Sequence, residues 1–182
     1  MTSIILTIFL EGDRDSILFH HKIKHYIEDH DIKVEIIEYS QKDKKFINSY
    51  IDLINRNRTT KKYYFLVDLD NCHSITDKKN ELMEIYNRLE ESRIIVVCKE
   101  IEGWYLGGLS QISAQNLQID LQKFNSLDPN TVTKSQFQRL KPKQINKLRV
   151  FYIFSAKLFD QIVAKERNLS FSSFHSRLFP LN

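Results

Sequence analysis

Residues 4–15, IILTIFLEGDRD, form a mainly apolar run that ends abruptly in acidic residues. A run of this length and composition is typical of a strand that is buried on both faces of a sheet. It predicts a strand that places Glu11 at the edge of the sheet. Gly12 allows the turn that follows, and a helix begins at Asp15. The first predicted strand therefore ends in a carboxylate.

A second apolar run follows the same plan. Residues 63–70, YYFLVDLD, end on Asp68 and Asp70. Alternate residues of a strand point the same way, so these two carboxylates are expected to share one side while Leu69 faces the core. Parallel strands end at one edge of a sheet, so we expect Glu11, Asp68 and Asp70 to converge there, with the first and third strands adjacent. A hard divalent cation, Mg²⁺ or Mn²⁺, would stabilise carboxylates crowded in this way.

The first two-thirds of the chain alternate strand-like and helix-like patterns. We expect strands at residues 4–10, 33–39, 63–67 and 93–98. Apolar residues at helical spacing indicate helices at 15–30, around 47–54 and around 82–89. Continuous apolar strands that alternate with helices predict an α/β fold, with a parallel four-stranded sheet and helices on both faces.

The last part of the chain predicts helices and loops. We expect a short helix after residue 99 that buries Trp104, and a turn at 127–131, where Pro129 disfavours helix. A longer helix is expected to begin at residue 141, with a buried stripe of Ile145, Leu148, Tyr152, Phe159, Ile162 and Val163. The predicted organisation is an α/β core at residues 1–108 and a helical extension at 109–182 packed on it within one domain.

The composition excludes several classes of protein. With 42% hydrophobic and 27% charged residues among 182, the chain is expected to fold as a soluble globular protein. It has no stretch of about 18 apolar residues and no signal-type start, so we expect a cytoplasmic protein without a membrane partner. Cys72 and Cys98 are expected as reduced thiols, and the Cys72–His73 pair lacks the second pair that a zinc site needs.

Basic residues are concentrated in one segment of a chain whose net charge is only +4. Residues 129–159 contain no Asp or Glu. We predict that this segment contacts a nucleic-acid backbone through Lys134, Arg139, Lys141, Lys143 and Lys147. The alternative is a solvated helix face. The histidines at positions 20, 21, 25 and 30 are expected on the surface, because no acidic third ligand accompanies them.

Three motifs together resemble those of the Toprim domain, the catalytic module of topoisomerases, bacterial primases and OLD-family nucleases. EGDRD follows the first strand, DLD ends the third, and KEIEGWYLGG follows the fourth. The last motif and the C-terminal SFSSFHSRL are similar to segments of small bacterial Toprim-like proteins related to the OLD nucleases, several of which lie in phage-defence loci. The resemblance covers roughly residues 4–108.

The resemblance implies a role for each acid at the strand ends. Glu11 matches a glutamate that acts as general acid/base or metal ligand, and Asp15 completes the first motif. Asp68 and Asp70 match a metal-binding pair, and Glu102 matches an acidic position that could hold a second ion. On physical grounds, Lys99 just after the fourth strand could stabilise charge that develops on a phosphate, which adds a catalytic cation to the predicted site.

The resemblance implies a Mg²⁺-dependent nuclease that cuts or nicks nucleic acid, with DNA favoured as substrate. The chain is too short for a topoisomerase, and Asn71-Cys72-His73 replaces the Pro-Gly that usually follows the acidic pair in ribosomal RNA maturation nucleases. The alternative is a non-catalytic metal- or nucleotide-binding partner of a separate ATPase. A phosphatase-type hydrolase is a third possibility, although its nucleophile would be expected on the first strand.

Overall fold

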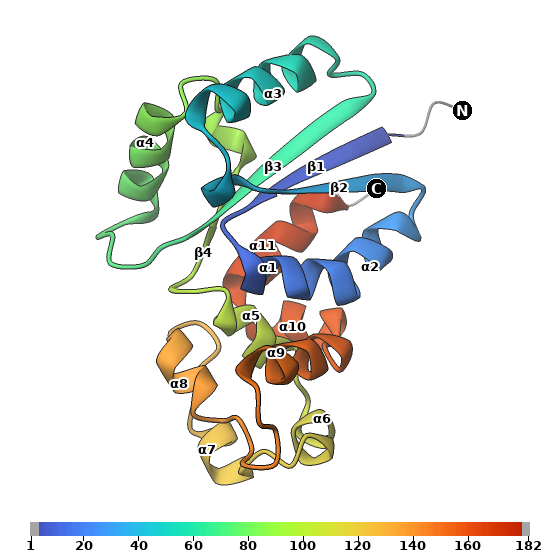
Figure 1. The fold of residues 1–182 in the computed structure, drawn as a ribbon, viewed down its shortest axis with the longest axis vertical. Coiled ribbons are helices and arrows are strands. Elements are labelled where there is room, and N and C mark those ends of the chain that lie inside the picture. Colours follow the sequence, from blue (N-terminus) through green and yellow to red (C-terminus); the bar gives the residue numbers. More distant parts are fainter. Residues whose placement is uncertain (1–3, 180–182) are drawn as a thin grey trace.

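The computed structural model describes residues 4–179 and has an α/β architecture. Its four strands form one parallel sheet in the order β2-β1-β3-β4 (Figure 1). The strands are β1 (Ile4–Leu10), β2 (Ile32–Glu38), β3 (Lys61–Asp68) and β4 (Ile94–Val97). The predicted fold class is confirmed, and so is the expected adjacency of the first and third strands.

Two apolar clusters lie on opposite faces of the sheet because successive strand residues point to opposite sides. In β3, Tyr64 and Leu66 belong to one cluster, whereas Tyr63, Phe65 and Val67 belong to the other. One face is covered by α3 (Lys44–Arg56) and α4 (Ile75–Ile85). The other is covered by α1 (Asp13–Leu18), a π-helical segment (Phe19–Ile23), α2 (Lys24–Glu28) and α11 (Leu169–Leu178). Burial on both faces explains the continuous apolar runs of the strands.

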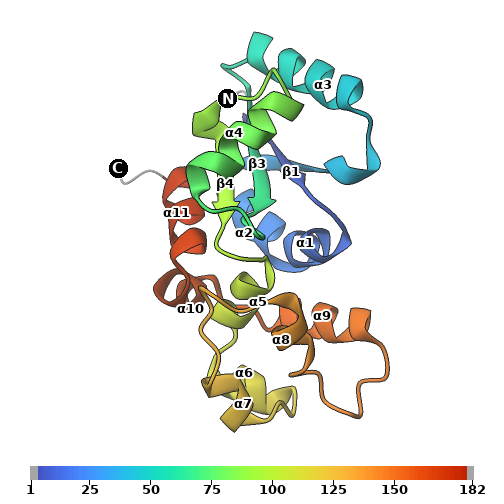
Figure 2. The same ribbon diagram turned by 90° about the vertical axis from the view of Figure 1, so that its left-hand side faces the viewer.

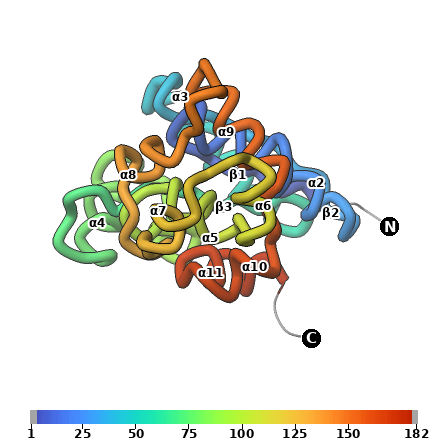
Figure 3. The backbone as a smooth tube through the Cα atoms, turned by 90° about the horizontal axis from the view of Figure 1, so that it is seen from below, coloured from blue at the N-terminus to red at the C-terminus, as the bar shows by residue number. Residues whose placement is uncertain are grey.

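Six short helices lie beyond the carboxyl ends of the strands (Figures 1 and 2). They are α5 (Glu102–Gly108), α6 (Gln111–Asn116), α7 (Leu121–Asn125), α8 (Lys134–Gln138), α9 (Leu148–Lys157) and α10 (Gln161–Arg167). Helix α5 packs against α10, and α9 packs against α1 and the π-helical segment (Figure 3). No helix within residues 4–179 has the length and apolar character that crossing a membrane requires.

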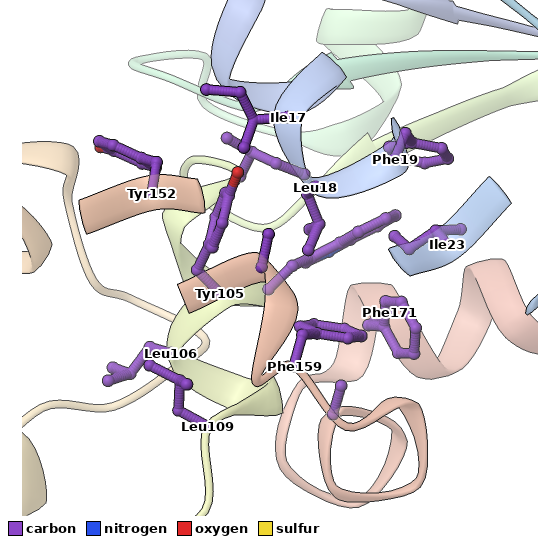
Figure 4. Packing of buried hydrophobic residues seen from close by; sticks show 14 of the residues in the cluster. Ile17, Leu18, Phe19, Ile23, Tyr105, Leu106, Leu109, Tyr152, Phe159 and Phe171 are labelled. Carbon is purple, nitrogen blue, oxygen red and sulfur yellow. The ribbon is translucent and has the colours of Figure 1, made fainter. Parts of the chain in front are cut away.

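The helical region and the sheet share one apolar cluster. Tyr105 and Phe159 pack close to Leu18 and Phe171, residues that lie far apart in the sequence (Figure 4). Trp104 is fully buried, as expected, and its indole N–H donates to Ser170 Oγ at 2.9 Å. The C-terminal helix α11 thus covers the sheet directly, and it completes the core of the α/β region.

The structure corrects both the start and the apolar stripe of the helix predicted in the last part of the chain. The helix expected from residue 141 begins only at Leu148, and residues 141–147 form a turn and irregular backbone in which Lys141 Nζ donates to the carbonyl of Ile145 at 2.6 Å. The helix then stops at Lys157, and α10 starts anew after the Asp160 cap, so the expected single stripe is broken. Ile162, predicted on that stripe, is 67% exposed.

Gly103 allows α5 to approach the 127–131 turn closely. A Cβ at this position would lie 2.3 Å from the backbone carbonyl oxygen of Pro129. We therefore expect Gly103→Ala to lower the free energy of unfolding by about 1–3 kcal/mol, as overpacking against rigid backbone does. Thermal unfolding measures this, with Gly12→Ala as the control, because a Cβ there would meet only Ser40 Oγ at 4.0 Å. An equal loss in both variants would contradict the steric account.

Candidate metal site at the carboxyl ends of the strands

A cleft of about 380 Å³ opens where the chain switches sides of the sheet. Strand β1 lies between β2 and β3, so the loops after β1 and β3 leave in opposite directions and create a crevice. All five acids predicted for the metal site line this cleft. The complete lining is Glu11, Gly12, Asp13, Arg14, Asp15, Ser40, Asp68, Asp70, Glu100, Ile101, Glu102 and Lys134.

The loop after β1 contributes Glu11 and Asp15. The exposed Glu11 follows the last residue of the strand, and its pKa is raised by partial burial and by the charge of Asp70. Asp15 lies in the first turn of α1, where Oδ2 accepts the backbone N–H of Gly12 at 2.9 Å. Burial raises the pKa of Asp15 to about 7, with Glu11 adding to the effect. The ionised form of either carboxyl therefore costs free energy in the absence of a cation.

Asp68 is the last residue of β3 and the most strongly perturbed acid of the cleft. Burial raises its pKa to about 9, and the neighbouring charges of Asp15, Glu11 and Glu102 act in the same direction. The backbone N–H of Ile101 donates to the Asp68 carboxylate and partly opposes this shift. At neutral pH the Asp68 carboxyl of the metal-free protein therefore carries a proton.

Asp70 lies beyond the end of β3 in a left-handed conformation, with φ of 50°. The alternation of side chains along a strand therefore does not extend to it, although its side chain still lines the cleft. Asp70 Oδ2 lies 3.2 Å from Nζ of Lys78, a residue of α4 whose side chain is only 11% exposed. Lys78 thus gives Asp70 a counter-ion that Asp68 lacks, and it was not predicted from the sequence.

Lys99 contacts the loop after β3. Its Nζ donates to the backbone carbonyl of Asp70 at 2.8 Å, and its own carbonyl accepts the N–H of Asp70 at 3.0 Å. Like Asp70, Lys99 has a positive φ, here 62°. Its amine therefore ties two strand-end loops together, and Lys99 does not belong to the lining of the cleft. The catalytic role expected for this lysine stays a prediction.

Glu102 joins the cleft to the helical region. It begins α5 and is 2% exposed, and its Oε1 accepts the hydroxyl of Tyr152 from α9. Burial raises the pKa of Glu102, while the hydroxyl of Tyr152 and the charge of Arg14 lower it. Arg14 Nε lies 4.0 Å from Glu102 Oε1, and the Arg14 guanidinium carbon lies 5.7 Å from the centre of the Tyr152 ring. Arg14 is therefore a cation of the cleft wall.

The basic segment reaches the cleft through one residue. Lys134 lines the cleft at the start of α8, and its backbone N–H donates to the carboxylate of Glu100. Glu100 also lines the cleft, and this hydrogen bond ties its carboxylate to the start of α8. The other four basic residues predicted to bind nucleic acid lie outside the lining: Arg139, Lys141, Lys143 and Lys147.

The donors of the cleft suit a hard cation. Seven carboxylates and two cationic side chains, Arg14 and Lys134, line the cleft, and all of the acidic donors are oxygens. Within residues 4–179, no group of three or more His, Cys, Asp or Glu side chains is arranged to surround a metal ion. Mg²⁺ is usually held by only one or two carboxylates and keeps several waters, so it does not require a complete protein cage. Asp68 and Asp70 are the residues that would hold it.

Comparisons with known proteins add no relative to this picture. No protein-family model matches the chain, and neither the curated proteins nor the solved structures contain a significant match. The fold and the cleft thus define the class of protein by themselves: a parallel α/β protein with an acidic cleft at the switch point of its sheet.

Proposed function

We propose that this protein cleaves or nicks phosphodiester bonds of nucleic acid with the help of Mg²⁺ or Mn²⁺, with DNA favoured as substrate. One observation carries the proposal. Five acids from three separate strand-end motifs line a single cleft at the switch point of a parallel sheet, where α/β proteins bind their ligands. The resemblance of these motifs to Toprim nucleases and phage-defence proteins supports the same conclusion.

Five residues of the cleft have a role in the proposed reaction. Asp68 and Asp70 hold the cation, which when bound neutralises the carboxylates and polarises phosphate and water oxygens. Glu11, whose pKa is raised, takes up or donates a proton at its carboxylate. Lys134 and Arg14 attract phosphate oxygens to the cleft walls.

A second candidate is a non-catalytic subunit that binds a metal or nucleotide and assists a separate ATPase. The ion pair between Lys78 and Asp70 favours this candidate, because Lys78 already neutralises one of the two carboxylates that would hold a catalytic ion. The two candidates differ in whether the purified chain turns over a substrate.

The experiment incubates the purified protein with supercoiled plasmid, single-stranded DNA and RNA in Mg²⁺, Mn²⁺ or EDTA. Nicking that requires the metal supports the proposed function. Saturable metal or nucleotide binding without any cleavage, with and without an ATPase partner, would support the second candidate instead.

Lys134 provides a test of substrate binding in the cleft. We expect Lys134→Met to lower kcat/KM about tenfold by raising KM, because the lysine contacts the substrate phosphate equally in the ground state and the transition state. The matched control is Lys44→Met on the exposed surface of α3, which removes the same charge from a residue that does not line the cleft. A Lys134→Met variant with the KM of wild type would show that the substrate does not reach this wall.

A further inference from the structure

A basic surface continues from the rim of the cleft across α9 and the π-helical segment that follows α1. It consists of His20 and His21 from the π-helical segment and Arg149 and Lys157 from α9, and we call it the α1–α9 basic face. All four side chains are exposed. The two parts are contiguous because α9 packs directly against α1 and the π-helical segment (Figures 1 and 3).

The charges of these groups act on the imidazole of His21. The pKa of His21 is lowered mainly by desolvation, and the charges of Lys157, His20, Arg149 and His25 act in the same direction. Cations that raise the cost of protonating a neighbouring imidazole create a local excess of positive potential. Such a potential attracts a polyanion, and α9 itself contains no acidic residue.

One ion pair connects this face to the candidate site. Nη1 of Arg149 donates to both carboxylate oxygens of Asp13, a residue that lines the acidic cleft. The basic face therefore begins at the rim of the cleft. Lys134 lies elsewhere in the cleft lining, on α8, so cations are available on two separate elements around the acids.

An exposed aromatic ring accompanies these cations. Phe154 is 42% exposed and precedes Lys157 by one helical turn, so the two side chains share a face of α9. Aromatic rings that stand beside phosphate-binding cations are typical of surfaces that bind single strands, because unpaired bases stack on them. Duplex bases are already stacked and offer no free face to Phe154.

We propose that the α1–α9 basic face binds the backbone of single-stranded nucleic acid next to the cleft, with Arg149 and Lys157 on phosphates and Phe154 under a base. This inference rests on the proposed function for its partner, yet binding to the face requires no metal. Its failure can therefore be separated from the failure of catalysis.

Fluorescence anisotropy of a labelled single strand and of its duplex, in EDTA over a series of salt concentrations, tests the proposal. The double variant Arg149→Gln/Lys157→Gln is compared with Lys44→Gln/Lys45→Gln, which removes two exposed charges from α3. We expect the first variant to bind the single strand about tenfold more weakly, with a log–log salt slope smaller by about 1.4, or about 0.7 for each lost phosphate contact. The α3 variant should bind like wild type.

Phe154→Ala separates stacking from charge. We expect it to weaken single-strand binding about fivefold without a change in the salt slope, and to leave duplex binding unaltered. Wild-type affinity and slope in Arg149→Gln/Lys157→Gln would overturn the proposal. Equal losses in the α3 variant, or binding to anionic vesicles with none to the oligonucleotides, would overturn it as well.

Cleavage in Mg²⁺ or Mn²⁺ is measured beside binding. A wild-type protein that binds the single strand through this face but cleaves nothing would refute the proposed nuclease and leave the binding face intact. Cleavage by wild type, combined with unaltered binding in Arg149→Gln/Lys157→Gln, would refute the binding face alone.

Discussion

Asp68→Asn is expected to reduce metal-dependent cleavage by more than about 100-fold while leaving the metal-free protein at least as stable as wild type. The metal loses a charged ligand whose contribution to catalysis is several kcal/mol. The fold loses nothing comparable, because Asp68 already carries a proton at neutral pH and an amide oxygen can still accept the N–H of Ile101. Nicking rates with Mg²⁺ measure the loss of cleavage, and melting temperatures in EDTA measure the stability of the metal-free protein.

Two further substitutions sharpen this test. Asp52→Asn makes the same chemical change on α3, where Asp52 pairs with Arg56, and it should affect neither measurement strongly. Asp70→Ala should also abolish cleavage, but it leaves the buried amine of Lys78 without its partner and is expected to destabilise the metal-free protein. If Asp68→Asn cleaved at the wild-type rate, Asp68 could not be a metal ligand.

The metal-free protein is expected to lose stability as the pH rises from about 4 to 9. Asp68 and Asp15 have folded-state pKa values of about 9 and about 7, raised from an ordinary value of 3.8, so the folded state binds more protons than the unfolded state. The stability that these two groups contribute is complete below pH 4. It falls by about 1.4 kcal/mol per pH unit for each group, through pH 7 for Asp15 and through pH 9 for Asp68.

Urea unfolding of wild type and Asp68→Asn in EDTA at several pH values isolates the Asp68 contribution as a difference. The difference in the free energy of unfolding between the two proteins should grow with pH up to about 9, because only wild type has an Asp68 carboxyl that loses a proton. Added Mg²⁺ should stabilise wild type more at high pH, since bound metal takes the place of the proton. Parallel curves for the two proteins would show that Asp68 titrates normally and that the cleft does not perturb it.

Much of the fold could be predicted because the local pattern and the tertiary structure agree. The apolar runs at 4–10 and 63–67 are continuous since helices cover both faces of the sheet, and parallel strands bring their acidic ends to one edge. Glu11, Asp68 and Asp70 could be selected for the same reason, because each stands at or just after a strand end.

The remainder depends on contacts between distant segments. Lys78 is an unremarkable lysine of α4 in the sequence, and only the placement of α4 beside the loop after β3 brings its amine to Asp70. The carboxylate of Glu100 accepts the backbone N–H of Lys134, the first residue of α8, and both residues line the cleft. Arg14 stood inside the EGDRD motif, and a basic residue between two expected site acids was the available signal for it.

Metal-dependent cleavage at this cleft is tested by following the nicking of a supercoiled plasmid by the purified wild-type protein as Mg²⁺ or Mn²⁺ is titrated, with Asp68→Asn and EDTA as controls. We expect a rate that rises and saturates with the metal in wild type and stays at background in Asp68→Asn and in EDTA. Cleavage that persists undiminished in EDTA or in Asp68→Asn would contradict the assignment of this cleft as a metal-dependent nuclease site, as would wild-type protein that never cleaves at any metal concentration.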